Sequence, residues 1–186
     1  EGRRRGGLLS LRLVGERFYE APPTIPVRIA TFLPSLDRLS ILLAKVTEVG
    51  ADEIFLIVDR QDRRGGEPAG SLERWRRTVT EAASQSKRAY VPTIHEPMPF
   101  EAFLDAHRKD AFLCDPAGQV VVGEVRSAGE VRSIAVIGPE AGLSPVEIGL
   151  PTARLPGNIL RIETAAIIAA ALLVVGRERI VVSGRK

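Results

Sequence analysis

The stretch from Val27 to Val58 constrains the fold most strongly, because it reads as a strand, a helix and a second strand in succession. Val27–Leu33 and Glu53–Val58 are short runs rich in β-branched, aliphatic and aromatic residues, as buried strands are. Between them, Asp37–Val49 carries leucine and valine at helical spacing, and Gly50 stands where a helix commonly ends. A strand–helix–strand unit of this kind predicts parallel pairing. We therefore expect an α/β fold built on a parallel sheet.

The rest of the chain continues this alternation of strands and helices. A helix is predicted from Ser71, as its N-cap, to about Ser86. The remaining predicted elements are an extended edge segment at 89–94, a helix at 99–107, strands at 110–115, 131–137 and 152–155, and a final helix at 164–175 that Gly176 closes. Residues 144–147 (SPVE) form a capping box with proline at the first helical position, so a short helix should begin there.

Residues 1–22 read as a separate segment. Leu8–Tyr19 has strand character, and the Pro22-Pro23 pair that follows predicts a boundary. The segment is too short to fold alone. We expect it to be either an edge strand of the main domain, at 23–186, or the tail of a further domain that is mostly absent.

The composition favours a protein of a reducing compartment, with the cytoplasm as its expected location. Cys114 is the only cysteine among 186 residues, which excludes an internal disulfide. No signal peptide is visible, because residues 1–5 are followed by no adequate apolar core. The most apolar run, Ala165–Val175, is shorter than the roughly 20 residues that span a bilayer, so no membrane association is expected.

Basic residues are distributed unevenly along the chain. The net charge is only +3 and the pI is near 9.4, but basic clusters fall in the first half, at 3–5, 60–64, 74–77 and 87–88. Clustered arginine favours a polyanion, such as a nucleic acid, as partner. The alternative is that these residues form solvated faces of helices and loops.

Several common catalytic signatures are absent from the sequence. No glycine-rich dinucleotide or Walker-type phosphate loop occurs, and no Gly-x-Ser-x-Gly elbow. Cys114, His95 and His107 lie far apart in sequence and do not have the spacing of metal ligands, so no metal site is expected. A core position is predicted for the cysteine, and surface or capping roles for the two histidines.

Two glycine- and proline-bearing loops remain as the candidate site. The first, Gly138–Pro145, follows the apolar run at 134–137, and the second covers Leu155–Ala165. Glycine lets a backbone take positive φ and lets a ligand approach it closely, and open α/β sheets bind ligands at the carboxyl ends of their strands. Together the loops could form a main-chain cradle, with Glu140, Arg161 and Glu163 as its chemically strong side chains. The alternative is an ordinary strand-to-helix turn and a local ion pair.

Four motifs occur in order along the chain: Lys45–Ala51 (KVTEVGA), Ala82–Arg88 (AASQSKR), Ile137–Ser144 (IGPEAGLS) and Ile159–Ala165 (ILRIETA). Together they closely resemble motifs of the small-subunit ribosomal RNA uridine-N3 methyltransferase family, within the SPOUT superfamily. The first is similar to its helix-end motif, the second to its Ala-x-Glu-Gln-Ser-x-Arg stretch, and the last two to its paired C-terminal signatures. Arg60 falls where the family has an arginine that opens a basic loop. The resemblance covers about residues 27–175.

The resemblance implies a SPOUT-type parallel sheet flanked by helices, with a C-terminal deep trefoil knot. It implies homodimers, a ribosomal RNA substrate, and S-adenosyl-L-methionine held in the knot's loops largely by main-chain groups. The residues that it places at the cofactor are Cys114, Asp115, Ile137, Gly138, Pro139, Glu140, Gly142, Leu155, Gly157, Ile159, Leu160, Thr164 and Ala165. Residues 1–22 would then be the remnant of an N-terminal RNA-binding (PUA-like) barrel.

The resemblance also implies methylation of N3 of a uridine in 16S ribosomal RNA. Arg161 would stabilise the developing anion and Glu163 would face the reacting groups, with Glu163 or Glu140 removing the N3 proton. The resemblance assigns the contacts with RNA phosphates to Arg60, Arg63, Arg64, Lys87 and Arg88.

The chain departs from the family pattern at several points. Ala141 replaces one glycine of a Gly-Gly pair, Asn158 stands where the family has arginine, and the segment at 144–155 is several residues shorter. These differences motivate two alternatives. One is a non-catalytic RNA-binding protein that retains the fold, and the other is a SPOUT methylase that acts on another RNA.

Overall fold

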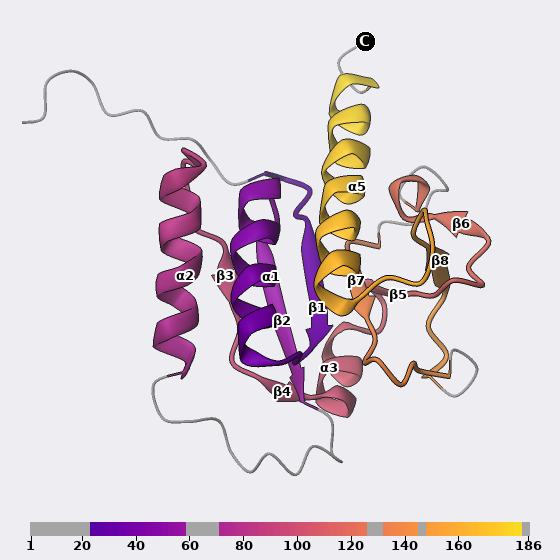
Figure 1. Cartoon of the computed structure of the whole chain (residues 1–186). Helices are drawn as coiled ribbons and strands as arrows, with labels where there is room; N and C mark the ends of the chain where they lie inside the picture. Colours follow the sequence, from indigo (N-terminus) through magenta and orange to yellow (C-terminus); the bar gives the residue numbers. More distant parts are fainter. Residues whose placement is uncertain (1–22, 59–70, 126–131, 145–147, 184–186) are drawn as a thin grey trace, which may run out of the picture.

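A parallel sheet forms the centre of the molecule (Figure 1). The computed structural model describes residues 23–58, 71–125, 132–144 and 148–183. Within these residues eight strands pair in the order β3-β2-β1-β7-β5-β8-β6, and β4 also pairs with β2. The strands are β1 (Arg28–Phe32), β2 (Glu53–Val58), β3 (Thr93–Ile94), β4 (Met98–Pro99), β5 (Ala111–Cys114), β6 (Val120–Val121), β7 (Ile134–Ile137) and β8 (Thr152–Arg154). The predicted parallel α/β fold is confirmed.

The central strands are apolar on both sides because both faces of the sheet are covered. Along β1, Ile29 belongs to one buried cluster and Ala30 to the other, and along β2 the same holds for Ile54 and Phe55. The strand register places residues of the same cluster side by side on one face, since Ile29 lies opposite Ile54 on β2 and Ala135 on β7. Continuous apolar runs are what doubly covered parallel strands require.

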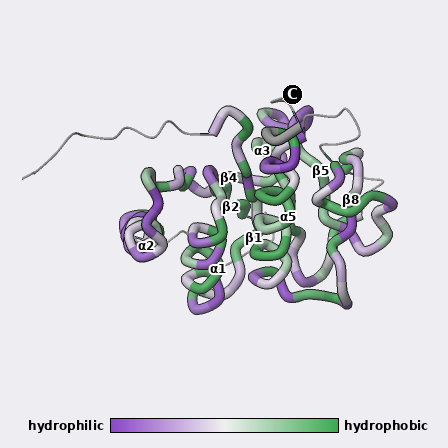
Figure 2. The backbone as a smooth tube through the Cα atoms, turned by 90° about the horizontal axis from the view of Figure 1, so that it is seen from above, coloured by the Kyte–Doolittle hydropathy of each residue, from purple (hydrophilic) through white to green (hydrophobic). Residues whose placement is uncertain are grey.

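Helices cover the two faces unequally (Figures 1 and 2). α1 (Leu36–Val49) and α5 (Ile162–Ser183) pack on one face, with α2 (Ser71–Gln85) against the outer side of α1. α3 (Phe100–His107) covers the other face, where Phe103 and Leu104 are buried. α1 ends as predicted at Gly50, whose φ is +120° and whose N–H donates to the carbonyl oxygens of Val46 and Thr47.

The predicted end of the last helix was wrong. α5 continues through Gly176 to Ser183. A β-carbon on Gly176 would lie 2.9 Å from the carbonyl oxygen of Gly123, in the short 3₁₀ turn Val122–Glu124. The glycine therefore allows the helix and this turn to approach closely, and it does not stop the helix.

Several short elements differ from the prediction or were not predicted. β4, β6 and the 3₁₀ turn each span two or three residues, too few to show periodicity. The segment predicted as an edge at 89–94 contributes only Thr93–Ile94 to β3. Ile148 N–H donates to the Ser144 carbonyl, as in a single helical turn, but residues 145–147 of the predicted capping box lie outside the described residues. So do Leu8–Tyr19 and the loop at 60–70.

The order of the strands determines where a ligand could bind. β7 lies between β1 and β5, although both precede it in the chain, and β8 lies beyond β5. The carboxyl ends of β5, β7 and β8 are therefore neighbours, and the loops that follow them meet at one edge of the sheet. The trefoil knot that the resemblance implies stays a prediction.

Candidate active site

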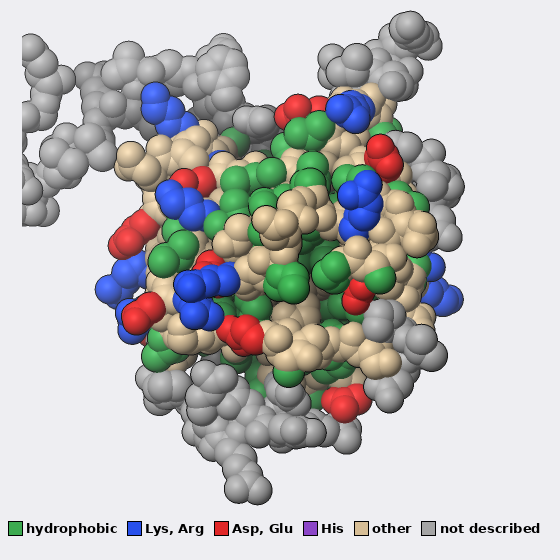
Figure 3. Space-filling model, turned by 45° about the vertical axis from the view of Figure 1, so that its right-hand side comes forward, with side chains coloured by type: hydrophobic (Ala, Val, Ile, Leu, Met, Phe, Trp, Pro, Cys, Tyr) green, Lys and Arg blue, Asp and Glu red, His purple; other side chains and the backbone are tan. Residues whose placement is uncertain are grey.

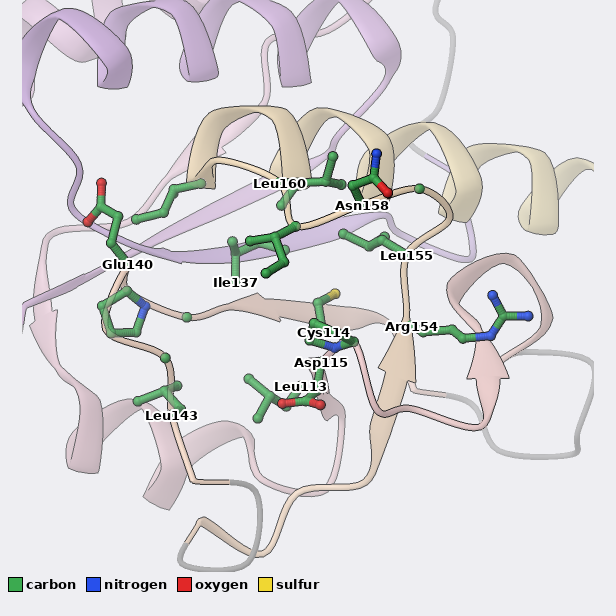
Figure 4. A pocket seen from close by; sticks show the side chains of 18 residues that line it. Leu113, Cys114, Asp115, Ile137, Glu140, Leu143, Arg154, Leu155, Asn158 and Leu160 are labelled. Carbon is green, nitrogen blue, oxygen red and sulfur yellow. The ribbon is translucent and has the colours of Figure 1, made fainter.

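A cavity of about 780 Å³ opens where the loops after β5, β7 and β8 meet the start of α5 (Figure 4). That volume lies within the range of small-molecule and cofactor sites. Its walls are formed by Leu113, Cys114, Asp115, Pro116, Ile137, Gly138, Pro139, Glu140, Gly142, Leu143, Arg154, Leu155, Gly157, Asn158, Ile159, Leu160, Ile162 and Ala165. The two loops that the sequence singled out thus share one hollow, together with the end of β5.

The loop after β7 is a tight turn closed by its own backbone. The N–H of Gly142 donates to the carbonyl oxygen of Pro139 at 2.9 Å, and Gly142 has φ of +78°. Outside glycine, only Lys87 has positive φ among the described residues, so Ala141 occupies an ordinary conformation. The alanine that replaces a family glycine therefore fits the turn, because the strained position falls on Gly142.

The loop after β8 combines an open backbone with an exposed apolar side chain. Gly157 has φ of +104°, and a β-carbon there would meet nothing within 4 Å. Ile159 is 93% exposed, although it lines the cavity. Leu155 and Leu160 are partly buried against the core. This loop thus offers accessible main chain and apolar surface to a ligand.

The end of β5 supplies a thiol and a carboxylate. Cys114 is partly accessible from the cavity, but the surrounding apolar side chains desolvate its sulfur and raise the pKa of the thiol. It therefore stays protonated at neutral pH and is a poor nucleophile. Asp115 accepts the N–H of Ala117 at 2.8 Å through Oδ1, which fixes the turn that follows the strand.

Most residues predicted to contact a cofactor lie on the walls of this cavity. Thr164 does not, since it is exposed on α5 outside the cavity walls. Sequence reasoning missed the wall residues Leu113, Pro116, Leu143, Arg154, Asn158 and Ile162. Each adjoins a predicted residue in sequence: Leu113 and Pro116 flank the end of β5, and the other four lie in or beside the two loops.

The two residues predicted to be catalytic lie beside the cavity and are not among its wall residues. Arg161 is exposed immediately before α5, and its carbonyl oxygen accepts the N–H of Ala165 at 2.8 Å. Glu163 lies in the first turn of α5, with its side chain 13% exposed. Its Oε1 is 4.0 Å from Arg38 Nε, and its Oε2 is buried with no hydrogen-bond partner among the described residues.

Arg88, which the resemblance assigns to RNA phosphates, makes contacts within the fold. Its side chain is 10% exposed, and it donates to the carbonyl oxygens of Thr47 and Ala51 and to Asp52 Oδ1. Asp52 also accepts from Arg177 at 2.8 Å and from Tyr90 at 2.8 Å. Arg88 therefore ties the ends of α1 and α2 to the sheet. A buried carboxylate needs such partners, so we expect Arg88 to stabilise the fold.

The other predicted RNA contacts divide into two groups. Lys87 is exposed and free to contact a polyanion, with φ of +58° at the end of α2. Arg60, Arg63 and Arg64 lie outside the described residues.

A comparison with family models decides the wider classification. The model of the RNA methyltransferase domain matches residues 21–174, which is most of the chain. The chain belongs to this RNA methyltransferase family. The match includes all the strands described above and the three loops around the cavity.

Named proteins and a solved structure are also similar to this chain over most of its length. The chain is 29% identical over 184 residues to ribosomal RNA small subunit methyltransferase E of Mycobacterium bovis, covering 89% of this chain and 68% of that protein. It is 31% identical over 160 residues to the protein of the same name from Synechocystis, covering 79% and 52%. The crystal structure of the Neisseria gonorrhoeae protein of that name, bound to S-adenosyl methionine, has a TM-score of 0.67 at 26% identity, covering 80% and 65%. The chain thus spans about half to two thirds of these relatives.

Two further observations concern the described residues of this methyltransferase domain. They contain no group of three or more His, Cys, Asp or Glu side chains that could hold a metal ion. None of their helices is long and apolar enough to cross a membrane.

Proposed function

We propose that this protein transfers a methyl group from S-adenosyl-L-methionine to N3 of a uridine in 16S ribosomal RNA. The observation that carries the proposal is the cavity formed by the loops after β5, β7 and β8, in a chain of the RNA methyltransferase family. The relatives named as small-subunit ribosomal RNA methyltransferases support the substrate class. An enzyme acting on this RNA would work in the cytoplasm.

The residues of the cavity fit S-adenosyl-L-methionine. Its walls combine apolar side chains, for a base ring, with two carboxylates, Asp115 and Glu140, for positively charged groups. Gly142 and Gly157 leave open space where a β-carbon would stand, so a ligand can approach the main chain. When bound, this cofactor supplies an activated methyl group on a sulfonium. The Neisseria relative, whose structure holds the same cofactor, supports the choice.

Arg161 is the proposed cation of the reaction. The uridine N3 is protonated at neutral pH, and its loss of a proton places negative charge on the neighbouring carbonyl oxygens. A guanidinium stabilises such charge when it is prepositioned. Arg161 is exposed beside the cavity, and it forms no ion pair with the described residues. Its position just before α5, fixed by the hydrogen bond to Ala165, keeps it at the cavity's edge.

Glu163 is the better of the two candidate bases. Oε1 of Glu140 already accepts a hydrogen bond from Arg38 at 2.9 Å, and its side chain is 62% exposed. Glu163 Oε2 has no partner among the described residues and is shielded from water. No donor competes for that oxygen, and RNA binding would have to bring it into contact with the target base before it could take the N3 proton. The target base must be unpaired or flipped to reach it.

A homodimer is part of the proposal. The side of the molecule with α5 and β8, turned forward in Figure 3, shows hydrophobic side chains gathered at its middle with charged ones around them. Leu36 and Ile41 on α1 are each 53% exposed, and Val175 on α5 is 44% exposed. These exposed apolar side chains lie on two helices that pack against each other, which supports the proposal. Light scattering should give twice the chain mass, and Ile41→Glu with Val175→Glu should halve it. The control Val91→Glu, which alters an apolar residue 50% exposed elsewhere, should not.

The central test has two parts. Calorimetric titration should show binding of S-adenosyl-L-methionine to the full chain, and its absence from a folded dimer would contradict any methylase function. Small ribosomal subunits from a strain lacking the modification should then accept labelled methyl groups. Mass mapping of the RNA should locate the label on N3 of a uridine. Label on a ribose or another base would favour a methylase with a different target.

A further inference from the structure

Arg38 is placed where three parts of the molecule meet. It lies in the first turn of α1, which follows β1, and β1 is the sheet neighbour of β7. The start of α1 is thus beside the loop after β7. Because α5 packs along α1, the first turn of α5 is also within reach. Sequence reasoning gave Arg38 no role.

The guanidinium of Arg38 reaches a carboxylate on each of the other two parts. Nη1 donates to Glu140 Oε1 at 2.9 Å, and Nε lies 4.0 Å from Glu163 Oε1. The first contact is a charge-assisted hydrogen bond, and the second distance is too long for one, so Glu163 is held by charge alone. One side chain thus links a wall residue of the cavity to the candidate base.

Helix stability does not account for this arginine. A cation in the first turn of a helix faces the positive end of the helix dipole, which is unfavourable, whereas Glu163 in the first turn of α5 is favourable there. Arg38 is 36% exposed and Glu140 62% exposed, so their ion pair contributes little to global stability. Its effect must be local, on where the two carboxylates lie.

We propose that Arg38 is a positioning residue of the methyl-transfer site. It holds Glu140 on the cavity wall by a hydrogen bond and attracts Glu163 through Oε1, while Oε2 keeps no hydrogen-bond partner among the described residues. Because two carboxylates compensate its charge, Arg38 is not the cation that stabilises the uridine anion. Stabilisation of that anion is the role proposed for Arg161. This inference rests on the function proposed above.

A double-mutant cycle on the full chain tests the proposal. Arg38→Ala should weaken binding of S-adenosyl-L-methionine about tenfold and lower kcat further, with thermal unfolding unchanged. In a Glu140→Gln background, Arg38→Ala should cost no more than about twofold in affinity, because the partner is already lost. Arg38→Lys, which keeps the charge, should restore part of kcat, and Arg38→Gln should not.

Lys45→Ala is the matched control, because it removes another cation of α1, one that pairs with Glu48 at 2.8 Å. It should leave affinity and kcat within about twofold. Wild-type affinity and turnover for Arg38→Ala, or equal losses in both backgrounds, would overturn the role of Arg38. A wild-type chain that neither binds the cofactor nor methylates RNA would instead overturn the proposed function.

Discussion

The carbonyl oxygen of Gly123 lies 2.9 Å from the point that a β-carbon on Gly176 would occupy. Although they lie far apart in the chain, the two residues bring a helix and a 3₁₀ turn into close contact. A methyl group on Gly176 would clash with the backbone of Gly123, so the contact leaves no room for a side chain. Local helix propensity and tertiary packing therefore oppose each other at this position.

Gly176→Ala should destabilise the fold by about 1–3 kcal/mol, as overpacking of a tight contact does. Propensity alone would predict the opposite, a gain of roughly 1 kcal/mol. Urea unfolding followed by circular dichroism measures the difference. A variant more stable than wild type would show that the turn at Gly123 moves away freely.

Lys87→Ala and Arg88→Ala should separate RNA binding from stability. Arg88 donates to Asp52 and to two carbonyl oxygens, so its removal leaves buried acceptors unpaired and should cost about 3 kcal/mol or more. Lys87 is exposed, so its removal should leave the unfolding midpoint unchanged and reduce the salt dependence of RNA binding. Filter binding at several salt concentrations, beside urea unfolding, gives both quantities. The same response from both variants would contradict the assignment.

Gly142→Ala should weaken cofactor binding, whereas Ala141→Gly should not. Gly142 has φ of +78°, a conformation that costs a residue with a side chain roughly 1–2 kcal/mol. The turn would relax and shift the adjacent Glu140 and Pro139. Calorimetry with S-adenosyl-L-methionine should give about a tenfold loss for the first variant and less than twofold for the second. Equal affinities would mean that this turn does not shape the site.

Arg161→Ala should abolish methyl transfer while leaving cofactor affinity within about tenfold, roughly 1.4 kcal/mol. The guanidinium is exposed beside the cavity and is not one of its wall residues, so its loss should spare binding. Single-turnover methylation of ribosomal subunits measures the chemical step. A fully active variant would remove Arg161 from the mechanism, and Arg161→Lys shows whether charge alone is sufficient.

Acidification should destabilise the fold through His107. Desolvation lowers the pKa of His107, the charges of His95 and Arg28 lower it further, and Asp110 and Glu53 oppose them. The folded state thus disfavours the imidazolium that the unfolded chain forms near pH 6.5. Stability is therefore fully present above that pH and is lost as the pH falls below it.

Urea midpoints at pH 7.5 and 5.5 check this expectation. His107→Phe, which keeps a ring beside Phe55 and Phe103, should reduce the difference between the two midpoints. Glu53 does not titrate in this window. Desolvation would raise its pKa, but hydrogen bonds from Arg28 and His95 outweigh that and lower it. An unchanged difference in the variant would assign the pH dependence to other groups.

Sequence patterns predicted the sheet well because its strands are apolar on both faces and end in turn residues. They also predicted the cavity loops, since Gly142 and Gly157 have the positive φ that glycine allows. They could not predict the surroundings of Asp52, whose partners Arg88 and Arg177 are 36 and 125 positions away. Arg88 looks like a surface cation in sequence, and only the fold shows which carbonyl oxygens it reaches.

Helix ends and long-range pairings escaped prediction for the same reason. Gly176 carries the local signal of a stop, but tertiary packing determines its role. Arg38 and Glu140 are 102 positions apart, and no local pattern joins them. The sequence thus identifies which loops form the site, while the alignment of charged groups depends on which strands become neighbours.

The central position of β7 has a consequence for biosynthesis. β1 and β5 have no common neighbour until residues 134–137 have been made, and α5 closes the core later still. A nascent chain therefore leaves β5, and the edge of β1 that faces β7, unpaired until then, because both partners of β5 come later in the sequence. Assembly of the methyl-donor site therefore has to wait until the start of α5 has been made, because Ile162 and Ala165 complete its walls.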